Sequence, residues 1–408
     1  MVAVLSRPFI ALYIAVFVAT MGISMVSPLL PVYADELGAD GIWLGLTFSA
    51  FAIVQTIAGP ITGRLSDRWA RKPFIVAGLL VYFIAALGYL TAQNFPQVIA
   101  FRAFSGLGTS MIFSVARAYV GDLTPPGHEG RWMGVFATAD FIGFGTGPLV
   151  AGVIRQVIGF DAVFVAMAAM MAISAIIVAT SLPWNPPEHR VSRRRTVNLP
   201  FATALKDRLV LAVTINMLLY SLTFGASFAF LALRLEDDIG ASPAMIGLAF
   251  SVQDITGGVA QPMFGRVADR YHRPTLVAIG LLTLGVLQGS LGAVESYAFV
   301  VVVLFLMGAS GALSGVAVGA IQVVAGRRVG MGTVLGLSSA GNGLGILIGS
   351  LIGGLLTNLY GIPAAFLFAG IAISCGAPLF LWLTRGLPTS EEELPPQMLE
   401  EGARAAGA

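Results

Sequence analysis

The chain has 408 residues, of which 57% are hydrophobic and only 11% carry a charge. A soluble domain carries about 25% charged residues, so these charges are too few to cover the surface of a water-soluble protein of this size. We therefore expect a surface that faces lipid. The net charge of +2 excludes little, because the distribution of charge matters more than its sum. The one cysteine, Cys375, has no partner for an intramolecular disulfide.

Twelve apolar runs follow one another along the chain, each near the ~20 residues that a helix needs to cross the hydrocarbon core. The runs lie at 8–32, 42–62, 73–92, 97–120, 131–154, 160–182, 208–232, 243–264, 274–292, 297–320, 331–357 and 363–384. The first is too long for the hydrophobic region of a signal peptide, so we interpret it as a spanning helix. The sequence therefore predicts an all-α integral membrane protein with twelve transmembrane helices.

Basic residues gather in the loops on one side of the predicted membrane. Those loops hold Arg64, Arg68, Arg71, Lys72, Arg131, the run from 190 to 208, Arg266, Arg270, Arg273, Arg327 and Arg328. The loops of the opposite side hold only Arg155 and Arg234 among several acids. Because cytoplasmic loops carry the excess of Lys and Arg, we expect a multi-pass protein of the inner (plasma) membrane with both termini in the cytoplasm.

The two halves of the chain superpose without gaps when residue 63 is moved onto residue 265. The segment Gly63-Arg64-Leu65-Ser66-Asp67-Arg68 then falls on Gly265-Arg266-Val267-Ala268-Asp269-Arg270. In the fifth span, four unevenly spaced glycines fall on glycines of the eleventh: Gly134, Gly143, Gly147 and Gly152 on Gly336, Gly345, Gly349 and Gly354. The repeat predicts two pseudo-symmetric six-helix bundles of one topology, related by an axis along the membrane normal.

The predicted domain boundaries follow from this repeat. We expect an N-terminal six-helix bundle at 1–182 and a C-terminal six-helix bundle at 208–386. A polar cytoplasmic linker at 183–207 joins them, and a disordered cytoplasmic tail occupies 387–408.

Two motifs carry a family resemblance that extends over nearly the whole chain. The segment from Gly63 to Pro73 resembles the signature loop of the major facilitator superfamily, with Ala70 where that family has glycine, and it recurs in the second half. The fifth span resembles the antiporter motif of the drug/proton exporters in that superfamily, through Gly134, Gly143, Gly147, Pro148 and Gly152. The resemblance implies the major facilitator fold and the twelve-helix drug/proton antiporter branch.

The resemblance also implies a gate at the cytoplasmic side, where a charge cluster fastens the outward-open state. Its members are Gly63, Asp67, Arg68, Arg71 and Asp122, with Gly265, Asp269 and Arg270 in the second half. Val324 stands where Asp122 would repeat, so the second cluster is expected to be weaker. The alternative interpretation is ordinary positive-inside topology with surface ion pairs.

The antiporter motif likewise admits two interpretations. By resemblance, this element limits leak in exporters that exchange substrate for protons. The alternative is packing alone, because glycines four apart let a neighbouring helix approach closely and Pro148 removes a backbone donor and bends the helix.

Two acidic residues lie deep in the predicted membrane, where ionisable side chains are costly and are candidates for function. Asp140 and Asp254 lie about 13 Å and about 16 Å into their spans at 1.5 Å per residue, so both are near the midplane. The family resemblance implies that the fifth and eighth helices are neighbours between the halves. The two carboxylates are then expected to approach each other or to face one shared cavity.

Both acids are predicted to take part in proton coupling. Burial and a second nearby carboxylate both favour the protonated form of a carboxyl group, so such a group can load and release protons. It can also bind a cationic substrate in competition with the proton. The alternative is a neutral acid that is hydrogen-bonded within the bundle.

Two arginines lie within the fourth span. By resemblance, Arg102 assists proton transfer and pairs with an acid, and the alternative is that it snorkels to the outer headgroups. Arg117 lies close enough to the cytoplasm to snorkel there, and we assign it no role.

The remaining candidates are expected to line a largely apolar substrate pocket. The predicted substrate-binding residues are Asp140, Asp254, Gln253, Asn216, Tyr220, Gln55, Asn342, Phe48, Phe136 and Phe250. Any single phenylalanine in this set is alternatively a packing residue.

The leading functional hypothesis is a secondary active transporter that exports lipophilic small molecules, cationic ones among them, in exchange for protons by alternating access. This is multidrug efflux. The first alternative is a proton-coupled exporter of a specific metabolite, such as a sugar or amino acid derivative, which would favour many polar pocket residues. A non-transporting membrane receptor is a third hypothesis, and the lack of an evident soluble domain argues against it.

An enzyme is not expected. The sequence has no nucleotide-binding loop and no metal-ligand cluster, and its three histidines, His128, His189 and His272, all lie in predicted loops. We expect a small-molecule substrate, protons and the lipid bilayer as partners. We expect no metal, no cofactor beyond the proton gradient, no nucleic acid, and a monomeric protein.

Overall fold

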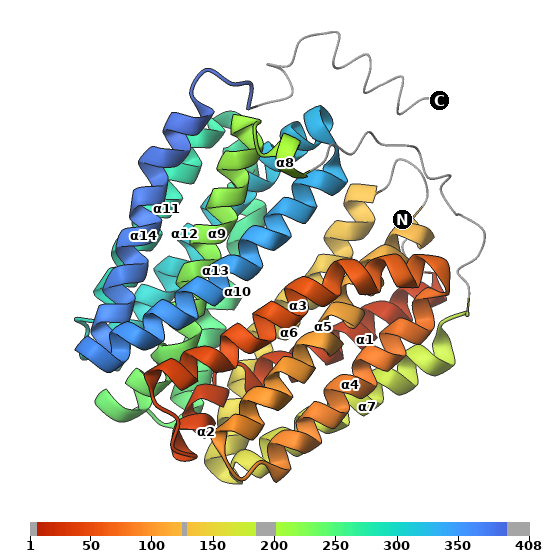
Figure 1. The fold of residues 1–408 in the computed structure, drawn as a ribbon, viewed down its shortest axis with the longest axis vertical. Coiled ribbons are helices and arrows are strands. Elements are labelled where there is room, and N and C mark those ends of the chain that lie inside the picture. Colours follow the sequence, from red (N-terminus) through yellow and green to blue (C-terminus); the bar gives the residue numbers. More distant parts are fainter. Residues whose placement is uncertain (1–5, 125–128, 185–200, 390–408) are drawn as a thin grey trace.

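A computed structural model describes residues 6–124, 129–184 and 201–389, and within these ranges the chain is helical without strands (Figure 1). The helices are α1 Arg7–Val26, α2 Leu30–Glu36, α3 Gly41–Arg68, α4 Arg71–Thr91, α5 Phe95–Leu123, α6 Glu129–Val157, α7 Phe160–Ser181, α8 Phe201–Ala204, α9 Arg208–Leu233, η2 Arg234–Asp238, α10 Pro243–Arg270, α11 Arg273–Ser290, α12 Tyr297–Val329, α13 Met331–Tyr360 and α14 Ile362–Thr384.

Each predicted apolar run coincides with a long helix. The physical reason is that backbone groups in lipid must satisfy one another, which a helix does within a single segment. Ten spans of the described chain are long and apolar enough to cross a membrane by length and composition. The other two long helices are α10, whose middle holds Gln253 and Asp254, and α11, which has 18 residues. We assign α10 and α11 as spans because the repeat places them on α3 and α4, which are spans of the first half.

The first predicted run, 8–32, lies within the single span Arg7–Glu36, in which α1 ends at Val26 and α2 begins at Leu30 because Pro28 has no N–H. One predicted boundary is wrong. The segment from Gly63 to Arg68, predicted as a loop, forms the last turns of α3, and only two residues connect α3 to α4. One of these, Ala70, has extended backbone (φ −170°, ψ 153°), so the connection does not need the glycine that the family has there.

The helices pack as two sets of six whose contacts repeat. Helix α1 packs on α6 and α7, as α9 packs on α13 and α14. Helices α3 and α4 pack on α5, as α10 and α11 pack on α12. This correspondence confirms the two pseudo-symmetric six-helix bundles. Residues 185–200 of the predicted linker and 390–408 of the predicted tail lie outside the described residues, and the short helix α8 occupies part of the linker.

The two halves meet through two helix pairs related by the repeat, α6 with α10 and α3 with α13. The predicted contact between the fifth and eighth spans is therefore confirmed. Glycines let these backbones approach: a Cβ on Gly152 or on Gly247 would collide with the carbonyl oxygen of Pro243 or of Pro148. Ser49 Oγ and Ser350 Oγ also lie 2.7 Å apart across the α3–α13 contact.

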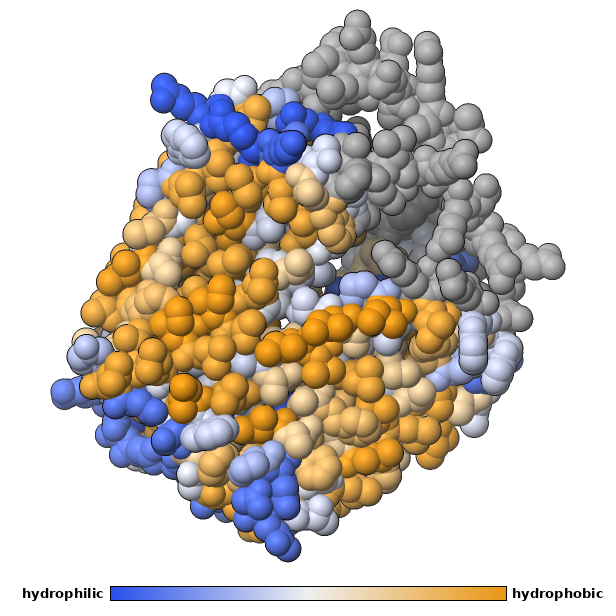
Figure 2. Space-filling model, viewed as in Figure 1, coloured by the Kyte–Doolittle hydropathy of each residue, from blue (hydrophilic) through white to orange (hydrophobic). Residues whose placement is uncertain are grey.

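We call the end where α1 begins and α14 ends the terminal end, and the end that holds α2 and η2 the opposite end. Figure 1 shows the two halves in contact near α2 and diverging toward α8 at the terminal end. Figure 2 shows a broad hydrophobic belt across both halves on this face, with hydrophilic residues gathered at the two ends. This distribution fits a protein embedded in a bilayer with its two ends in water.

Candidate functional site

A cavity of about 970 Å³ lies between the halves. Phe201 of α8 and Leu335 of α13 line its outer part, so it extends from the terminal end toward the middle of the molecule. Its aromatic wall is Phe51, Phe113, Phe141, Phe144 and Phe201. Its neutral polar side chains are Ser27, Gln55, Thr56, Thr109, Ser110, Ser114, Ser339 and Asn342. This is the size and lining expected of a small-molecule site.

Asp140 lies in the wall of this cavity, where it contacts two neighbouring helices. Its Oδ2 is 3.4 Å from the Nη2 of Arg117 on α5, and its Oδ1 accepts a hydrogen bond of 3.3 Å from Thr20 Oγ1 on α1. The Asp140 side chain is 15% exposed, whereas that of Arg117 is 64% exposed. The carboxylate is thus held in place while its counter-ion remains accessible from the cavity.

The position of Asp140 follows from the antiporter motif. A Cβ on Gly143 would lie 2.8 Å from Thr20 Cβ, and one on Gly147 would collide with Ser24 Oγ, so this face of α6 packs closely on α1. Ser24 Oγ donates to the Gly143 carbonyl at 3.0 Å. Asp140 is one turn from Gly143 on the same face, and the close approach brings Thr20 within reach of it.

The motif glycines have three different surroundings. Gly143 and Gly147 pack on α1, Gly152 packs on α10, and a Cβ on Gly134 would meet nothing within 4 Å. Close packing therefore accounts for three of the four glycines. Nothing in the structure explains Gly134.

Asp254 is half-buried on α10 and is not among the residues that line the cavity. Leu248, Val259 and Met263 are exposed and mark the outer face of α10, and at 3.6 residues per turn Asp254 lies on the opposite side. The prediction that the two carboxylates approach each other or share one cavity is not met in this structure, because Asp140 turns toward α1 and α5.

Arg102 is buried, with 3% of the residue exposed, so it does not snorkel to the headgroups. Its guanidinium stacks over the rings of Phe51 at 4.3 Å and Phe48 at 5.4 Å, and no acid of the described chain pairs with it. Its Nε also has no hydrogen-bond partner. Both interpretations from the sequence, snorkelling and pairing with an acid, are therefore corrected to a buried cation held by aromatic rings.

The other predicted pocket residues divide into two groups. Gln55 and Asn342 line the cavity as expected, and Asn342 accepts a hydrogen bond from Ser221. The remaining six are outside the lining: Phe48, Phe136, Phe250, Asn216, Tyr220 and Gln253. The three phenylalanines are buried in packing.

The sequence interpretation missed Arg117 and the hydroxyl residues around it. A signal was present, because Ser110, Ser114 and Arg117 are spaced four and three residues apart and share one face of α5. The nearness of Arg117 to the membrane boundary obscured this signal, since a snorkelling arginine has the same sequence position.

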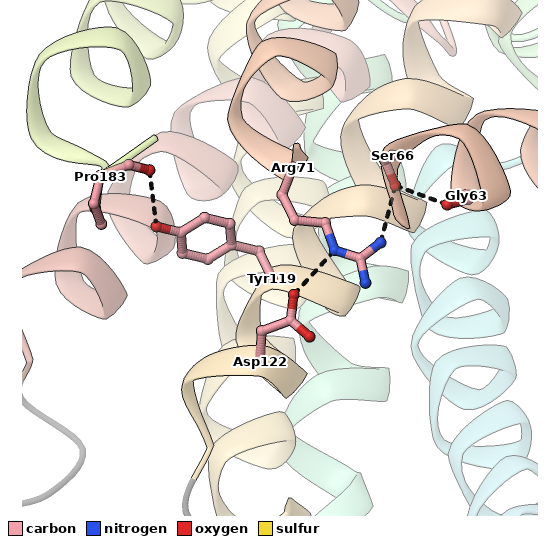
Figure 3. Close-up of polar contacts among 6 residues, drawn as sticks. All are labelled: Gly63, Ser66, Arg71, Tyr119, Asp122 and Pro183. Atoms are coloured by element: carbon pink, nitrogen blue, oxygen red, sulfur yellow. Dashed lines mark hydrogen bonds and ion pairs between the residues drawn. The ribbon is translucent and has the colours of Figure 1, made fainter. Parts of the chain in front are cut away.

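The predicted gate residues form contacts within the first half (Figure 3). Arg71 Nε donates to Asp122 Oδ2 at 3.0 Å, and Arg71 Nη1 donates to Ser66 Oγ at 2.9 Å. Ser66 Oγ in turn donates to the Gly63 carbonyl at 2.8 Å. The side chains of Asp67, Arg68 and Asp269 lie outside the described residues.

In the second half, no acid stands where Asp122 would repeat. Val324 is fully buried where Asp122 would repeat, and Arg273, the counterpart of Arg71, donates to the carbonyls of Ala268 and Thr389 at 3.4 and 3.0 Å. Arg270 is exposed, and a Cβ on Gly265 would meet nothing within 4 Å.

An ion cluster that the sequence interpretation missed joins the halves at the opposite end. Arg155 of α6 makes two hydrogen bonds of 2.6 Å to the carboxylate of Glu236 in η2, and its Nη2 lies 3.3 Å from Glu36. Its guanidinium also stacks on Phe160 at 4.2 Å. We call Arg155 and Glu236 the end clamp. The site thus has a cavity at the terminal end and a closed contact at the other.

Comparisons with known proteins agree with this geometry. The sequence profile of the Major Facilitator Superfamily matches residues 12–232 and 213–405. The Quinolone resistance protein NorA of Staphylococcus aureus is 25% identical over 372 residues, with 91% of this chain and 95% of that protein covered. Multidrug resistance protein 2 of Bacillus subtilis is 27% identical over 381 residues, with 91% and 94% covered.

A solved structure shares the fold at low identity. A bacterial homologue of the human lysosomal transporter Spinster, in its inward-facing and occupied conformation, superposes with a TM-score of 0.77 at 14% identity. The match covers 95% of this chain and 98% of that one. Together with the repeated packing and the central cavity, these matches show that the chain is a multi-pass membrane transporter that belongs to the major facilitator superfamily.

Proposed function

We propose that this transporter exports lipophilic small molecules, cationic ones among them, across the inner (plasma) membrane in exchange for protons. The terminal end then lies in the cytoplasm, the protein acts as a monomer, and the proton gradient is its only energy source. The observation that carries the proposal is Asp140, a carboxylate held at 15% exposure in the wall of a large aromatic cavity between the two halves.

Asp140 supports exchange because it can bind a proton or a cation but not both. An ionised carboxylate accepts hydrogen bonds at both oxygens, from Thr20 and Arg117, and a cationic substrate adds to or replaces these. Protonation removes the negative charge and with it the attraction for the cation. Competition between proton and substrate at one group is sufficient to couple their movements in opposite directions.

The end clamp and the cavity support alternating access. With Arg155 bound to Glu236, the halves are closed at the opposite end while the cavity reaches the terminal end. Separation of α6 from η2 and closure around α3 and α13 would expose Asp140 to the other side. Rocking of two repeats around a central site is the movement that a pseudo-symmetric transporter allows.

The names of the relatives support the choice of substrate class. One relative is a quinolone resistance protein and another a multidrug resistance protein, each at about a quarter identity over nine-tenths of this chain. Efflux of lipophilic compounds is therefore proposed here in preference to uptake.

The test is transport of a lipophilic cationic dye into inverted membrane vesicles with a pH gradient. We expect the wild-type protein to accumulate the dye and Asp140→Asn to lose at least tenfold of the gradient-driven rate, because asparagine cannot bind a proton. Asp254→Asn is the matched comparison outside the cavity. Gradient-driven transport that survives in the Asp140 variant would remove Asp140 from the coupling step.

The second candidate is export of a specific polar metabolite, and one observation favours it. The cavity presents eight neutral polar side chains besides its phenylalanines, more than the sequence alone indicated. A polar site of this kind rejects analogues that lack a matching hydroxyl or amine. If sugars or amino acid derivatives compete for transport and hydrophobic dyes do not, this candidate replaces the first.

A further inference from the structure

The residues that line the cavity include two with a formal charge at neutral pH, Arg117 and Asp140. Their charges are opposite, so the described lining has no net charge. A site designed for simple cations would present an unpaired acid, and a site for simple anions an unpaired base. The pairing of Arg117 with Asp140 therefore affects which substrates the cavity binds. The inference rests on the proposed export function.

The Arg117–Asp140 pair is loosely made. The two side chains share a single contact of 3.4 Å, and the Arg117 side chain is 64% exposed. Ion pairs with such exposure stabilise proteins little, because solvent competes for both partners. A guanidinium has five N–H donors in a planar fork, and Arg117 uses one of them on Asp140. A ligand can therefore take the place of either partner at low cost.

Each charged group has an aromatic ring one helical turn away on its own helix. Phe113 precedes Arg117 by four residues on α5, and Phe144 follows Asp140 by four residues on α6. All four residues line the same cavity. The lining thus combines a positive group, a negative group and two rings, which suits a flat apolar body that carries charges of both signs.

We propose that Arg117 is a specificity-determining residue, and that the cavity prefers zwitterionic amphiphiles whose carboxylate binds Arg117 while their amine binds Asp140. A carboxylate matches the guanidinium fork in a two-bond geometry. A simple cation that binds Asp140 leaves Arg117 without its counter-ion, and a simple anion leaves Asp140 without its own. A zwitterion supplies a new counter-ion to Arg117 and to Asp140 at the same time.

The test compares two dyes that differ only in this carboxylate. Rhodamine B carries a carboxylate and a delocalised cation, and its ethyl ester carries the cation alone. Their dissociation constants are measured by fluorescence anisotropy on the full-length protein in nanodiscs. We expect the wild-type protein to bind rhodamine B about tenfold more tightly than the ester, the equivalent of one charge-assisted hydrogen bond.

Substitution of Arg117 separates this role from a structural one. Arg117→Gln is expected to bring the ratio of the two dissociation constants to about one, because rhodamine B loses its partner while the ester no longer leaves Arg117 without a counter-ion. Arg117→Lys is expected to retain part of the preference. Arg385→Gln, at an exposed arginine outside the cavity, is expected to keep the full ratio. Equal wild-type affinities, binding of neither dye, or an unchanged ratio in Arg117→Gln would overturn the proposal.

These binding measurements need no proton gradient, so they are independent of the coupling proposed above. A dye preference that depends on Arg117 supports the two-point site even if the pH gradient drives no transport. In that case proton exchange is contradicted and the site is retained.

Discussion

The buried guanidinium of Arg102 shows what the structure adds at the scale of one residue. In the described chain it stacks on Phe51 and Phe48 and hydrogen-bonds the Tyr89 hydroxyl, and no acid pairs with it. A cation–π contact contributes about 2 kcal/mol when desolvated, whereas removing a cation from water costs several kcal/mol. A sequence cannot distinguish this state from snorkelling, because both place an arginine in the same part of a span.

This imbalance predicts the effect of removing the charge. Arg102→Met keeps an unbranched side chain of similar length, so we expect the unfolding temperature of the purified protein to stay the same or to rise. Thermal unfolding in detergent measures this. Phe51→Leu is the comparison, and it should lower the unfolding temperature because it removes one stacking partner and leaves the charge. A large loss of stability in Arg102→Met would mean that the guanidinium has a stronger partner than the two rings and the Tyr89 hydroxyl.

At the scale of the helix, the repeat and the apolar runs predicted most of the architecture. They predicted which segments are helical and which spans face each other, because a helix in lipid must satisfy its own backbone and glycines mark close approach. They did not predict the helical turns beyond the hydrocarbon, since the apolar run ends there and the hydrogen-bonded helix of α3 continues to Arg68.

The candidate site was harder to predict than the helices. Of the site residues predicted from the sequence, Asp140, Gln55 and Asn342 line the cavity. It could not predict that Asp254 is absent from that lining, because the rotation of α10 about its axis depends on its packing against α6 and α12. The site lies on a seam between two halves, and contacts across a seam are not encoded by the periodicity of either helix.

The antiporter motif of α6 provides a prediction with an internal control. A Cβ on Gly147 would collide with Ser24 Oγ, so Gly147→Ala should push α1 away from α6 and lower both the unfolding temperature and transport. Gly134→Ala has free space around its Cβ, and removal of a helical glycine stabilises by up to about 1 kcal/mol. We therefore expect it to be neutral or slightly stabilising. If both variants behave alike in thermal unfolding and dye transport, the packing interpretation is wrong.

At the scale of the whole molecule, the two ends differ in what joins the halves. The opposite end has the end clamp, in which Arg155 makes two short hydrogen bonds to Glu236 and has 8% of its side chain exposed. The terminal end has the cavity, and two ion pairs described there, Arg71–Asp122 and Arg328–Asp207, each lie within one half. The signature residues therefore stabilise one half here, while the end clamp joins the two.

Breaking the end clamp should shift the molecule toward the other conformation. Glu236→Gln leaves one acceptor oxygen, so one of the two charge-assisted hydrogen bonds to Arg155 is lost and the other is weakened. We expect a loss of about 1–3 kcal/mol, or roughly fivefold to 150-fold in the equilibrium between the two closures. Distances between fluorophores attached across the opposite end of a variant without Cys375 would lengthen. Asp122→Asn, which affects a pair within one half, should leave that distance unchanged. If the distance between the fluorophores does not change in Glu236→Gln, the end clamp does not hold this end closed. The close helix contacts at Gly152 and Gly247 would then be sufficient to do so.

The central claim is that movement of substrate in one direction is coupled to movement of protons in the other. It is tested by proteoliposomes that contain a pH-sensitive dye, to which substrate is added on one side with no initial pH gradient. We expect the wild-type protein to carry protons toward the side of added substrate as substrate enters, and Asp140→Asn to move none. Substrate flux through the wild-type protein without any proton movement would contradict it.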